Sequence, residues 1–160
     1  NKEKVSIEDV KDSWDKIKVK EKPINHSKTP ITDRLRLKIR PHSSTTAAMI
    51  ISKKASQSGF EWQRIEKVWG KLYEELDELK DALKQNKSSA AETEIGDVIF
   101  TLINIARWNK LSIEEGLAKT NKRFLDRCAY IEENIKGELH SQKKEILEKF
   151  WEQAKTKLNH

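Results

Sequence analysis

Apolar residues recur in steps of three and four along the chain from Glu61 onward, which is the spacing of one face of an α-helix. The first such stripe consists of Ile65, Val68, Trp69, Leu72, Leu76, Leu79 and Leu83. The 160 residues include only five glycines and three prolines, too few turn formers for the many reversals of a β-sandwich or barrel. The pattern therefore predicts an all-α fold.

Three further helices are predicted after the first stripe. The second covers about 90–108 and is apolar almost all round, which indicates a buried helix or a subunit interface. The third begins at Ser112 with a capping-box pattern and ends near Gly137, and the fourth begins at about Ser141. Because only 36% of the residues are apolar, the core of one chain is small. We therefore expect a helical bundle completed by dimerisation.

The N-terminal part differs from the rest in composition. All prolines fall between Pro23 and Pro41, an interval that reads as an irregular linker, and a short amphipathic helix around Trp14 precedes it. We therefore divide the chain into an N-terminal helix and Pro-containing basic linker, residues 1–43, and a helical catalytic domain, residues 44–160.

The net charge of +6 comes from an excess of lysine and arginine in the first 58 residues. Such a segment can attract a polyanion, so a basic RNA-binding module remains an alternative. A solvated connector is the simpler interpretation, because no aromatic residues that would stack on bases interrupt residues 16–40. We therefore expect no nucleic-acid partner.

Two further features bear on the location of the protein. The longest nearly apolar run covers nine residues, 98–106, whereas a membrane span needs about 20. The single cysteine, Cys128, excludes an internal disulfide and fits a reducing compartment. No membrane partner and a cytoplasmic location are expected.

Two pairs of acids do not fit a purely amphipathic interpretation. Glu75 and Glu78 lie at the edge of the first apolar stripe, about 60° apart, while Glu74 points away from the core. Glu94 and Asp97 have the same spacing within the second, nearly apolar helix. A solvated helix face, with Lys71 as an ion-pair partner, is the alternative for the first pair.

Two neighbouring helices that each present such a pair can bring four carboxylates together, and a divalent cation would relieve their repulsion. Because no histidine stands three positions after a glutamate, the oxygen-only set points to Mg²⁺ or Mn²⁺. Gly96 supports this convergence if it marks a close backbone approach. Mg²⁺ usually takes its remaining ligands from water and substrate phosphates, so a phosphorylated substrate is expected, with Arg123 and Arg127 as candidate phosphate ligands.

Residues 59–151 resemble the MazG-type nucleoside triphosphate pyrophosphohydrolases. The segments that carry the resemblance are Gly59-Phe60-Glu61-Trp62, Glu74-Glu75-Leu76-Asp77-Glu78, Glu94-Ile95-Gly96-Asp97 and Asn121-Lys122-Arg123-Phe124-Leu125-Asp126-Arg127. They occur in the order and with the spacing of the family. The combination of the two acidic motifs is specific in a helical context, although either half alone would be weak.

The resemblance implies an all-α, dimeric or higher bundle that hydrolyses nucleoside triphosphates to monophosphate and pyrophosphate with Mg²⁺ and removes surplus or non-standard nucleotides. Carried over to this chain, it makes Glu75, Glu78, Glu94 and Asp97 metal ligands, with Glu74 as an outer acid. It makes Lys71, Arg123, Arg127 and Trp151 substrate-binding residues. Packing beside Phe150 is an equally good interpretation of Trp151, and a catalytically silent nucleotide-binding bundle is the alternative function.

The chain departs from the family pattern in three places. Arg123 stands where lysine is frequent, which changes the hydrogen-bond geometry. Residues 44–55 match the preceding helix of the family only loosely and lack its usual arginine. Bacterial members often carry two such domains, and only the C-terminal one is visible here.

Overall fold

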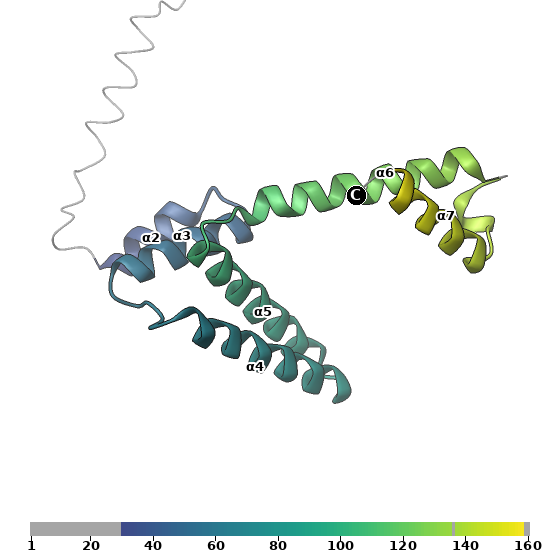
Figure 1. Ribbon diagram of the computed structural model, residues 1–160. Helices are drawn as coiled ribbons and strands as arrows, with labels where there is room; N and C mark the ends of the chain where they lie inside the picture. Colours follow the sequence, from purple (N-terminus) through teal and green to yellow (C-terminus); the bar gives the residue numbers. More distant parts are fainter. Residues whose placement is uncertain (1–29, 136, 159–160) are drawn as a thin grey trace, which may run out of the picture. The chain divides into compact units, whose positions relative to one another are not determined.

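The computed structural model describes residues 30–135 and 137–158. Over these residues it contains six α-helices, one 3-10 turn and no strand (Figure 1), so the all-α prediction is confirmed. The elements are α2 (Ile31–Ile39), α3 (Ser44–Gln57), α4 (Ile65–Lys84), α5 (Ser88–Trp108), α6 (Ile113–Asn134), the 3-10 turn Leu139–Ser141 and α7 (Lys144–Lys157). The predicted helix around Trp14 lies outside the described residues.

The expected irregular linker contains a helix, so that part of the prediction is wrong. Helix α2 lies between Pro30 and Pro41, with Pro30 as its N-cap. Proline is tolerated there, because the first N–H groups of a helix have no internal partner. Asp33 in the first turn and Lys38 in the last also suit the helix dipole. The chain divides into two compact units, Asn1–Pro41 and His42–His160, and α2 belongs to the first.

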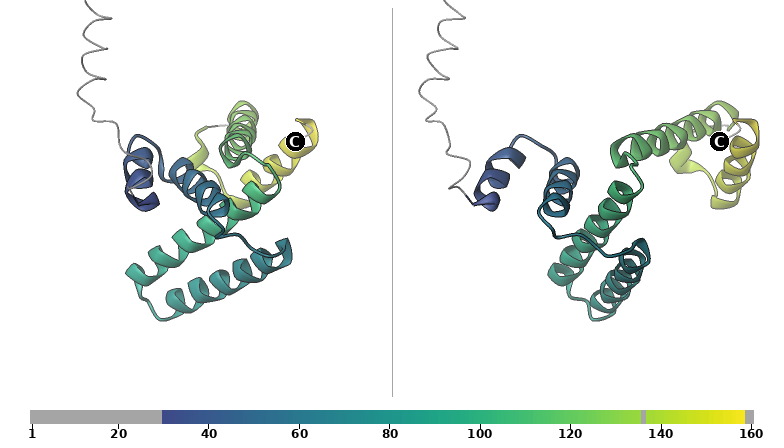
Figure 2. Two further views of the ribbon diagram at one scale, coloured as in Figure 1. Left: turned by 90° about the vertical axis from the view of Figure 1, so that its left-hand side faces the viewer. Right: turned by 60° about the vertical axis from the view of Figure 1, so that its left-hand side comes forward.

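Helices α4 and α5 form a hairpin that provides the main core of the second unit. Val68, Leu72 and Ile105 are buried against one another, and Ile65, Leu76, Val98 and Trp108 pack around them. The two helices run side by side in all the views (Figure 2). Helix α3 packs on α5, and α6 packs on α7. The apolar stripe of α4 therefore packs against a neighbouring helix, as its helical spacing predicts.

Three helices end in the same way, with a residue of positive φ that turns the chain. Gly59 follows α3 with φ 94°, Asn86 follows α4 with φ 54°, and Lys110 follows α5 with φ 57°. In each case the next residue donates its N–H back to the last turn, as Phe60 does to the carbonyl of Ala55. This is the Schellman arrangement, for which glycine is best suited.

One sequence expectation about the hairpin fails. Gly96 was expected to mark a close backbone approach, but a Cβ atom at this position would meet nothing within 4 Å in the described part of the chain. The glycine is therefore not required for the packing of α5 on α4. A search of the described helices also finds none that combines the length and apolar character needed to cross a membrane.

Replacement of Lys110 by glycine should stabilise the fold by about 1 kcal/mol, because a left-handed conformation costs a residue with a Cβ about that much. The measurement is the free energy of unfolding in urea. Lys119→Gly, in the interior of α6, should destabilise the protein by about 1 kcal/mol. A loss of stability in both variants would contradict the role assigned to the Lys110 turn.

Candidate functional site

The acids of α4 differ sharply in exposure, as the position of the apolar stripe predicts. Glu75 is buried, with 6% of its surface exposed, because it lies beside Leu72 and Leu76 on the helix surface. Glu74 is exposed, as expected. Glu78, which the sequence also places at the edge of the stripe, is exposed, since it lies about 60° further round the helix than Glu75.

Packing of α5 on α4 brings acids from both helices together. Glu75, Glu78 and Glu94 each offer a carboxylate oxygen, and these oxygens lie within 4.8 Å of one another. Glu75 is buried, Glu94 is intermediate and Glu78 is exposed. Three of the four predicted ligands therefore converge, and they form a set of oxygen donors that is open to solvent on one side.

Asp97, the fourth predicted ligand, is not part of this group of three. It lines a cavity of about 240 Å³ together with Glu75 and Lys71. Its side chain is therefore next to the cluster, one helical turn beyond Glu94 on α5. We call Glu75, Glu78, Glu94 and Asp97 the acidic cluster.

Lys71 is the cation that the chain itself provides at this site. Its ammonium lies 2.8 Å from a carboxylate oxygen of Glu74 and 2.8 Å from one of Glu75. The hydrogen bonds to Glu74 and then to Glu75 raise the pKa of Lys71 above its ordinary value, so the side chain stays charged. Lys71 thus forms the ion pair that the alternative interpretation of these acids gave it, and its expected role in substrate binding stays a prediction.

The carboxyl of Glu78 interacts with the other acids of the cluster. Its pKa is raised above the ordinary value, first by a hydrogen bond with Glu75 and then by burial. The negative charges of Glu75 and Glu94 add to the effect, and Lys71 opposes it. The neighbouring carboxylates and Lys71 therefore act on the pKa of Glu78 in opposite directions.

A polar network that the sequence did not predict lies beside the acidic cluster. Arg107, near the end of α5, forms two hydrogen bonds of 2.7 Å with the carboxylate of Glu61 in the loop before α4. Its Nε donates to the hydroxyl of Ser52 on α3, also at 2.7 Å. The Ser52 hydroxyl donates in turn to the side-chain oxygen of Asn104 at 2.7 Å. The network thus joins α3, the loop and α5.

The remaining predicted substrate residues lie on α6 and α7. The guanidinium of Arg127 stacks over the ring of Trp151, 5.2 Å from its centre. Phe124 contacts the same ring at 5.2 Å with the planes tilted by 57°. Arg123 donates to the hydroxyl of Thr120. The structure thus brings Arg127 and Trp151 together, whereas the cation paired with Glu74 and Glu75 is Lys71.

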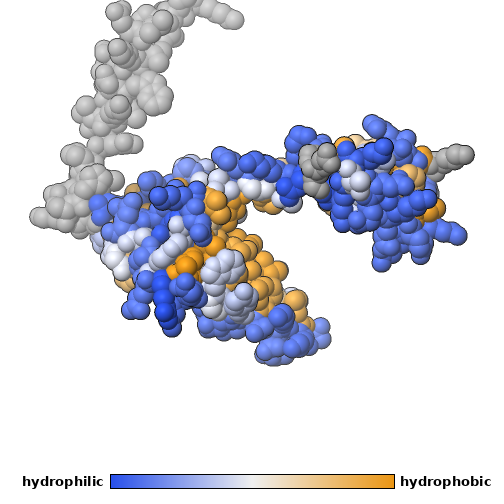
Figure 3. Space-filling view, in the orientation of Figure 1, coloured by the Kyte–Doolittle hydropathy of each residue, from blue (hydrophilic) through white to orange (hydrophobic). Residues whose placement is uncertain are grey.

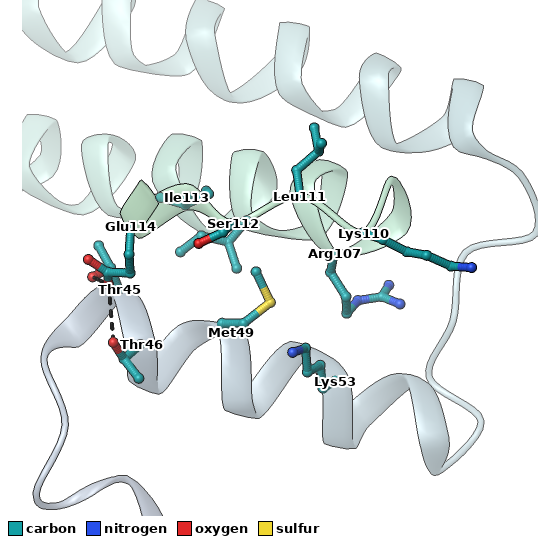
Figure 4. A pocket seen from close by; sticks show the side chains of 11 residues that line it. Thr45, Thr46, Met49, Lys53, Arg107, Lys110, Leu111, Ser112, Ile113 and Glu114 are labelled. Carbon is teal, nitrogen blue, oxygen red and sulfur yellow. Dashed lines mark hydrogen bonds between the residues drawn. The ribbon is translucent and has the colours of Figure 1, made fainter. Parts of the chain in front are cut away.

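A second cavity, of about 400 Å³, lies between α3, the end of α5 and the start of α6 (Figure 4). Its one acid, Glu114, accepts hydrogen bonds from the hydroxyls of Thr45 and Thr46 at 2.5 and 3.1 Å. These bonds lower the pKa of Glu114 and hold the first turn of α6 against α3. With a single acid already bonded to two hydroxyls, this cavity has no carboxylate cluster for a cation.

The fold and the acidic cluster define a class: an all-α hairpin of helices whose facing acids form a group of oxygen ligands suited to a divalent cation. Residues 63–131 match the family profile of the MazG nucleotide pyrophosphohydrolase domain. The chain therefore carries a MazG-type domain, as the sequence predicted.

Curated relatives agree with this assignment. The chain is 36% identical over 108 residues to the nucleoside triphosphate pyrophosphohydrolase/pyrophosphatase MazG of Thermotoga maritima, which covers 66% of this chain and 41% of that protein. It is 29% identical over 147 residues to the nucleoside triphosphate pyrophosphohydrolase of Escherichia coli, covering 89% of this chain and 54% of the relative. The chain thus spans about half the length of these relatives.

The ion pair between Glu61 and Arg107 should make stability depend on pH. Hydrogen bonds from Arg107, with smaller ones from Ser56 and Trp62, lower the pKa of Glu61 from 4.5 to about 2. A lowered pKa in the folded state stabilises the fold fully above pH 4.5, and this contribution is lost as the pH falls toward 2. Glu61→Gln should therefore reduce the free energy of unfolding at pH 7 by about 1 kcal/mol.

The measurement is urea unfolding of both proteins between pH 7 and pH 3. The difference between wild type and Glu61→Gln should shrink as the pH approaches 3. Glu148→Gln, on the exposed side of α7, is the matched control and should show little effect at any pH. A difference that stays constant with pH would contradict the role given to the carboxylate.

Proposed function

We propose that this chain hydrolyses nucleoside triphosphates between the α and β phosphates, giving the monophosphate and pyrophosphate, with Mg²⁺ or Mn²⁺ as cofactor. The observation that carries the proposal is the convergence of Glu75, Glu78 and Glu94 within 4.8 Å. The MazG-type domain and the names of the relatives support it. Removal of surplus or non-standard nucleotides is the corresponding role.

The residues of the cluster fit a divalent cation on three counts. All donors are carboxylate oxygens, the ligands that Mg²⁺ and Mn²⁺ prefer. Carboxylates held within 4.8 Å of one another repel, and a cation would relieve this repulsion. The cluster is also accessible, because Glu78 and Asp97 are exposed. Glu75, Glu78, Glu94 and Asp97 are the proposed ligands.

A bound divalent cation would neutralise phosphate charge and increase the acidity of a bound water. The carboxylates of the cluster would hold the cation, and one of them would accept the proton of the attacking water. Glu74, which pairs with Lys71, is an outer acid that keeps the lysine beside the cluster. The ammonium of Lys71 is positioned to contact phosphate oxygens.

Arg123 and Arg127 complete the proposed phosphate site, and Trp151 borders the nucleotide. The stacking of Arg127 on Trp151 fixes the plane of the guanidinium, which suits two parallel hydrogen bonds to a phosphate. For this part of the proposal, the pair of helices α6 and α7 of one subunit must face the acidic cluster of the same or another subunit.

A homodimer or higher homo-oligomer is part of the proposal. Ile95, Ile99 and Leu102 are spaced by four and three residues, so they share one face of α5, and all three are exposed. Figure 3 shows this apolar surface along α5. This face offers an apolar surface to a second subunit on a side of α5 that differs from the one carrying Glu94 and Asp97.

Two alternatives give different results in the same assays. A catalytically silent bundle would bind the cation and nucleotide without hydrolysis, but the convergence of the acids disfavours it, because loss of one ligand is the simplest route to silence. A basic RNA-binding module would use residues 16–40, most of which lie outside the described residues. Steep salt dependence of RNA binding would support that alternative.

Asp97→Asn and Glu94→Gln should each reduce pyrophosphate release from nucleoside triphosphates at least about 100-fold, the usual loss when one electrostatic stabiliser of a transition state is removed. The assay measures pyrophosphate and monophosphate with Mg²⁺ and with a chelator. Glu92→Gln, an exposed position on the same helix, is the control and should retain activity. Absence of hydrolysis by the folded wild type in Mg²⁺ would contradict the proposed function.

Ile99→Glu should convert the oligomer to a monomer, because a charge would be buried in an apolar interface. Sedimentation equilibrium measures the mass of each variant. Leu83→Glu, which changes an exposed apolar residue on α4, should leave the mass unchanged. A wild type that is monomeric at high concentration would contradict the dimer proposal.

A further inference from the structure

The cavity beside the acidic cluster has two chemically different ends. Asp97 lines it together with the charged groups of Lys71 and Glu75. Asn104, about two helical turns further along α5, lines it together with Ser52, and both are neutral polar residues. Its volume is about 240 Å³, below the roughly 300–1,000 Å³ of pockets that enclose a whole drug-sized ligand. The cavity is therefore suited to one part of a larger ligand that continues past the acids.

Three aromatic side chains line the same cavity and remain exposed. Phe60 is 83% exposed, Trp62 37% and Phe100 36%. Phe60 and Trp62 come from the loop that Gly59 starts, and Phe100 comes from α5. Exposed aromatic rings gathered around one cavity indicate a ligand with a flat face, since such rings stack on nucleobases of any sequence.

The network of hydrogen bonds at the neutral end determines how the amide of Asn104 is turned. Arginine can only donate, so the Ser52 oxygen accepts from Arg107 and its proton goes to the Asn104 oxygen. The amide nitrogen of Asn104 correspondingly donates to the backbone carbonyl of Phe100 at 3.0 Å. The oxygen of the amide therefore faces Ser52, because the reverse orientation would place it against the Phe100 carbonyl, with two acceptors facing each other.

This orientation leaves part of the amide for a ligand. An asparagine side chain has two N–H donors and two lone pairs. One N–H bonds to Phe100 and one lone pair accepts from Ser52. The second N–H is thus a donor with a fixed direction at a cavity that Asn104 lines.

The ion pair of Arg107 with Glu61 connects this donor to the aromatic loop. Glu61 stands between Phe60 and Trp62, and it also accepts the backbone N–H of Trp62 at 2.9 Å. The same guanidinium that positions Ser52 therefore holds the loop with both aromatic rings. The Arg107 guanidinium therefore holds both the loop whose aromatic side chains would stack on a base and, through Ser52, the Asn104 amide that would contact the edge of the base.

We infer that Asn104 recognises the edge of the substrate's nucleobase by donating its second N–H to a ring carbonyl, and that Ser52 and Arg107 are positioning residues for this contact. The inference rests on the proposed function, because the acidic end of the cavity is assigned to the triphosphate through its cation. The neutral end then holds the uncharged part of the nucleotide. Phe60, Trp62 and Phe100 provide the faces on which the base stacks.

The test compares pairs of nucleotides that differ by a carbonyl and an amino group at the ring edge: UTP against CTP, and ITP against ATP. Asn104→Asp removes the donor and leaves only acceptors. The ratio of kcat/KM for the carbonyl base to that for the amino base should fall at least about tenfold, the size of one lost hydrogen bond. An unchanged ratio with pyrophosphate release intact would overturn the inference and leave the proposed function standing.

Asn109→Asp is the matched control, since Asn109 also donates to the carbonyl four residues earlier, at 2.8 Å, but does not line this cavity. Its ratio should equal that of the wild type. Ser52→Ala tests the positioning role, because the Asn104 amide can turn once the Ser52 hydroxyl is removed. The ratio of kcat/KM for the carbonyl base to that for the amino base should then move toward one. The affinity for Mn²⁺ should stay the same. Equal loss of activity on all four nucleotides would indicate a purely structural role and would overturn the inference.

Binding of non-hydrolysable α,β-methylene analogues of UTP and CTP, measured by calorimetry, separates the two proposals. If the wild type releases no pyrophosphate, the proposed function fails, and the analogue affinities still decide the inference. The inference is supported if Asn104→Asp lowers the affinity for the UTP analogue relative to the affinity for the CTP analogue. An equal ratio of the two affinities in the wild type and in Asn104→Asp overturns the inference.

Discussion

The packing of α4 against α5 is the interaction on which the rest of the site depends. Val68 and Leu72 on α4 bury against Ile105 on α5, and this contact fixes the rotation of both helices about their axes. Because the acids lie at the edges of the same apolar stripes, the rotation that buries the core also directs Glu75 and Glu94 toward each other. The hydrophobic effect thus supplies the free energy that holds like charges together.

Local rules were sufficient for much of this arrangement. The stripe of α4 predicted the helix, its buried face and the position of Glu75 at the edge of that face, since all of these follow from helical periodicity. The convergence of acids from two helices followed from the short connection between them, which makes consecutive helices antiparallel neighbours. The assignments of Glu75, Glu78 and Glu94 to one place required no information beyond the sequence.

The parts that the sequence did not predict depend on exceptions to a local rule or on contacts between distant residues. Helix α2 was missed because Pro30 and Pro41 were interpreted as breakers, although proline is well tolerated at a helix start. Gly96 was wrongly given a packing role, because glycine within a helix has more than one explanation. Arg107 and Glu61, which form an ion pair, are 46 residues apart in the sequence. No periodicity in the sequence relates two positions this far apart.

Lys71 has a consequence for the order in which the domain is assembled. Small domains whose ligands repel one another often cannot fold until a metal ion binds, because binding free energy is their folding free energy. Here an ammonium already lies 2.8 Å from the buried carboxylate of Glu75, and the core of the hairpin is apolar. The polypeptide therefore provides a counter-ion for Glu75 while the hairpin forms, and the proposed cation would compete with this ammonium for the carboxylate.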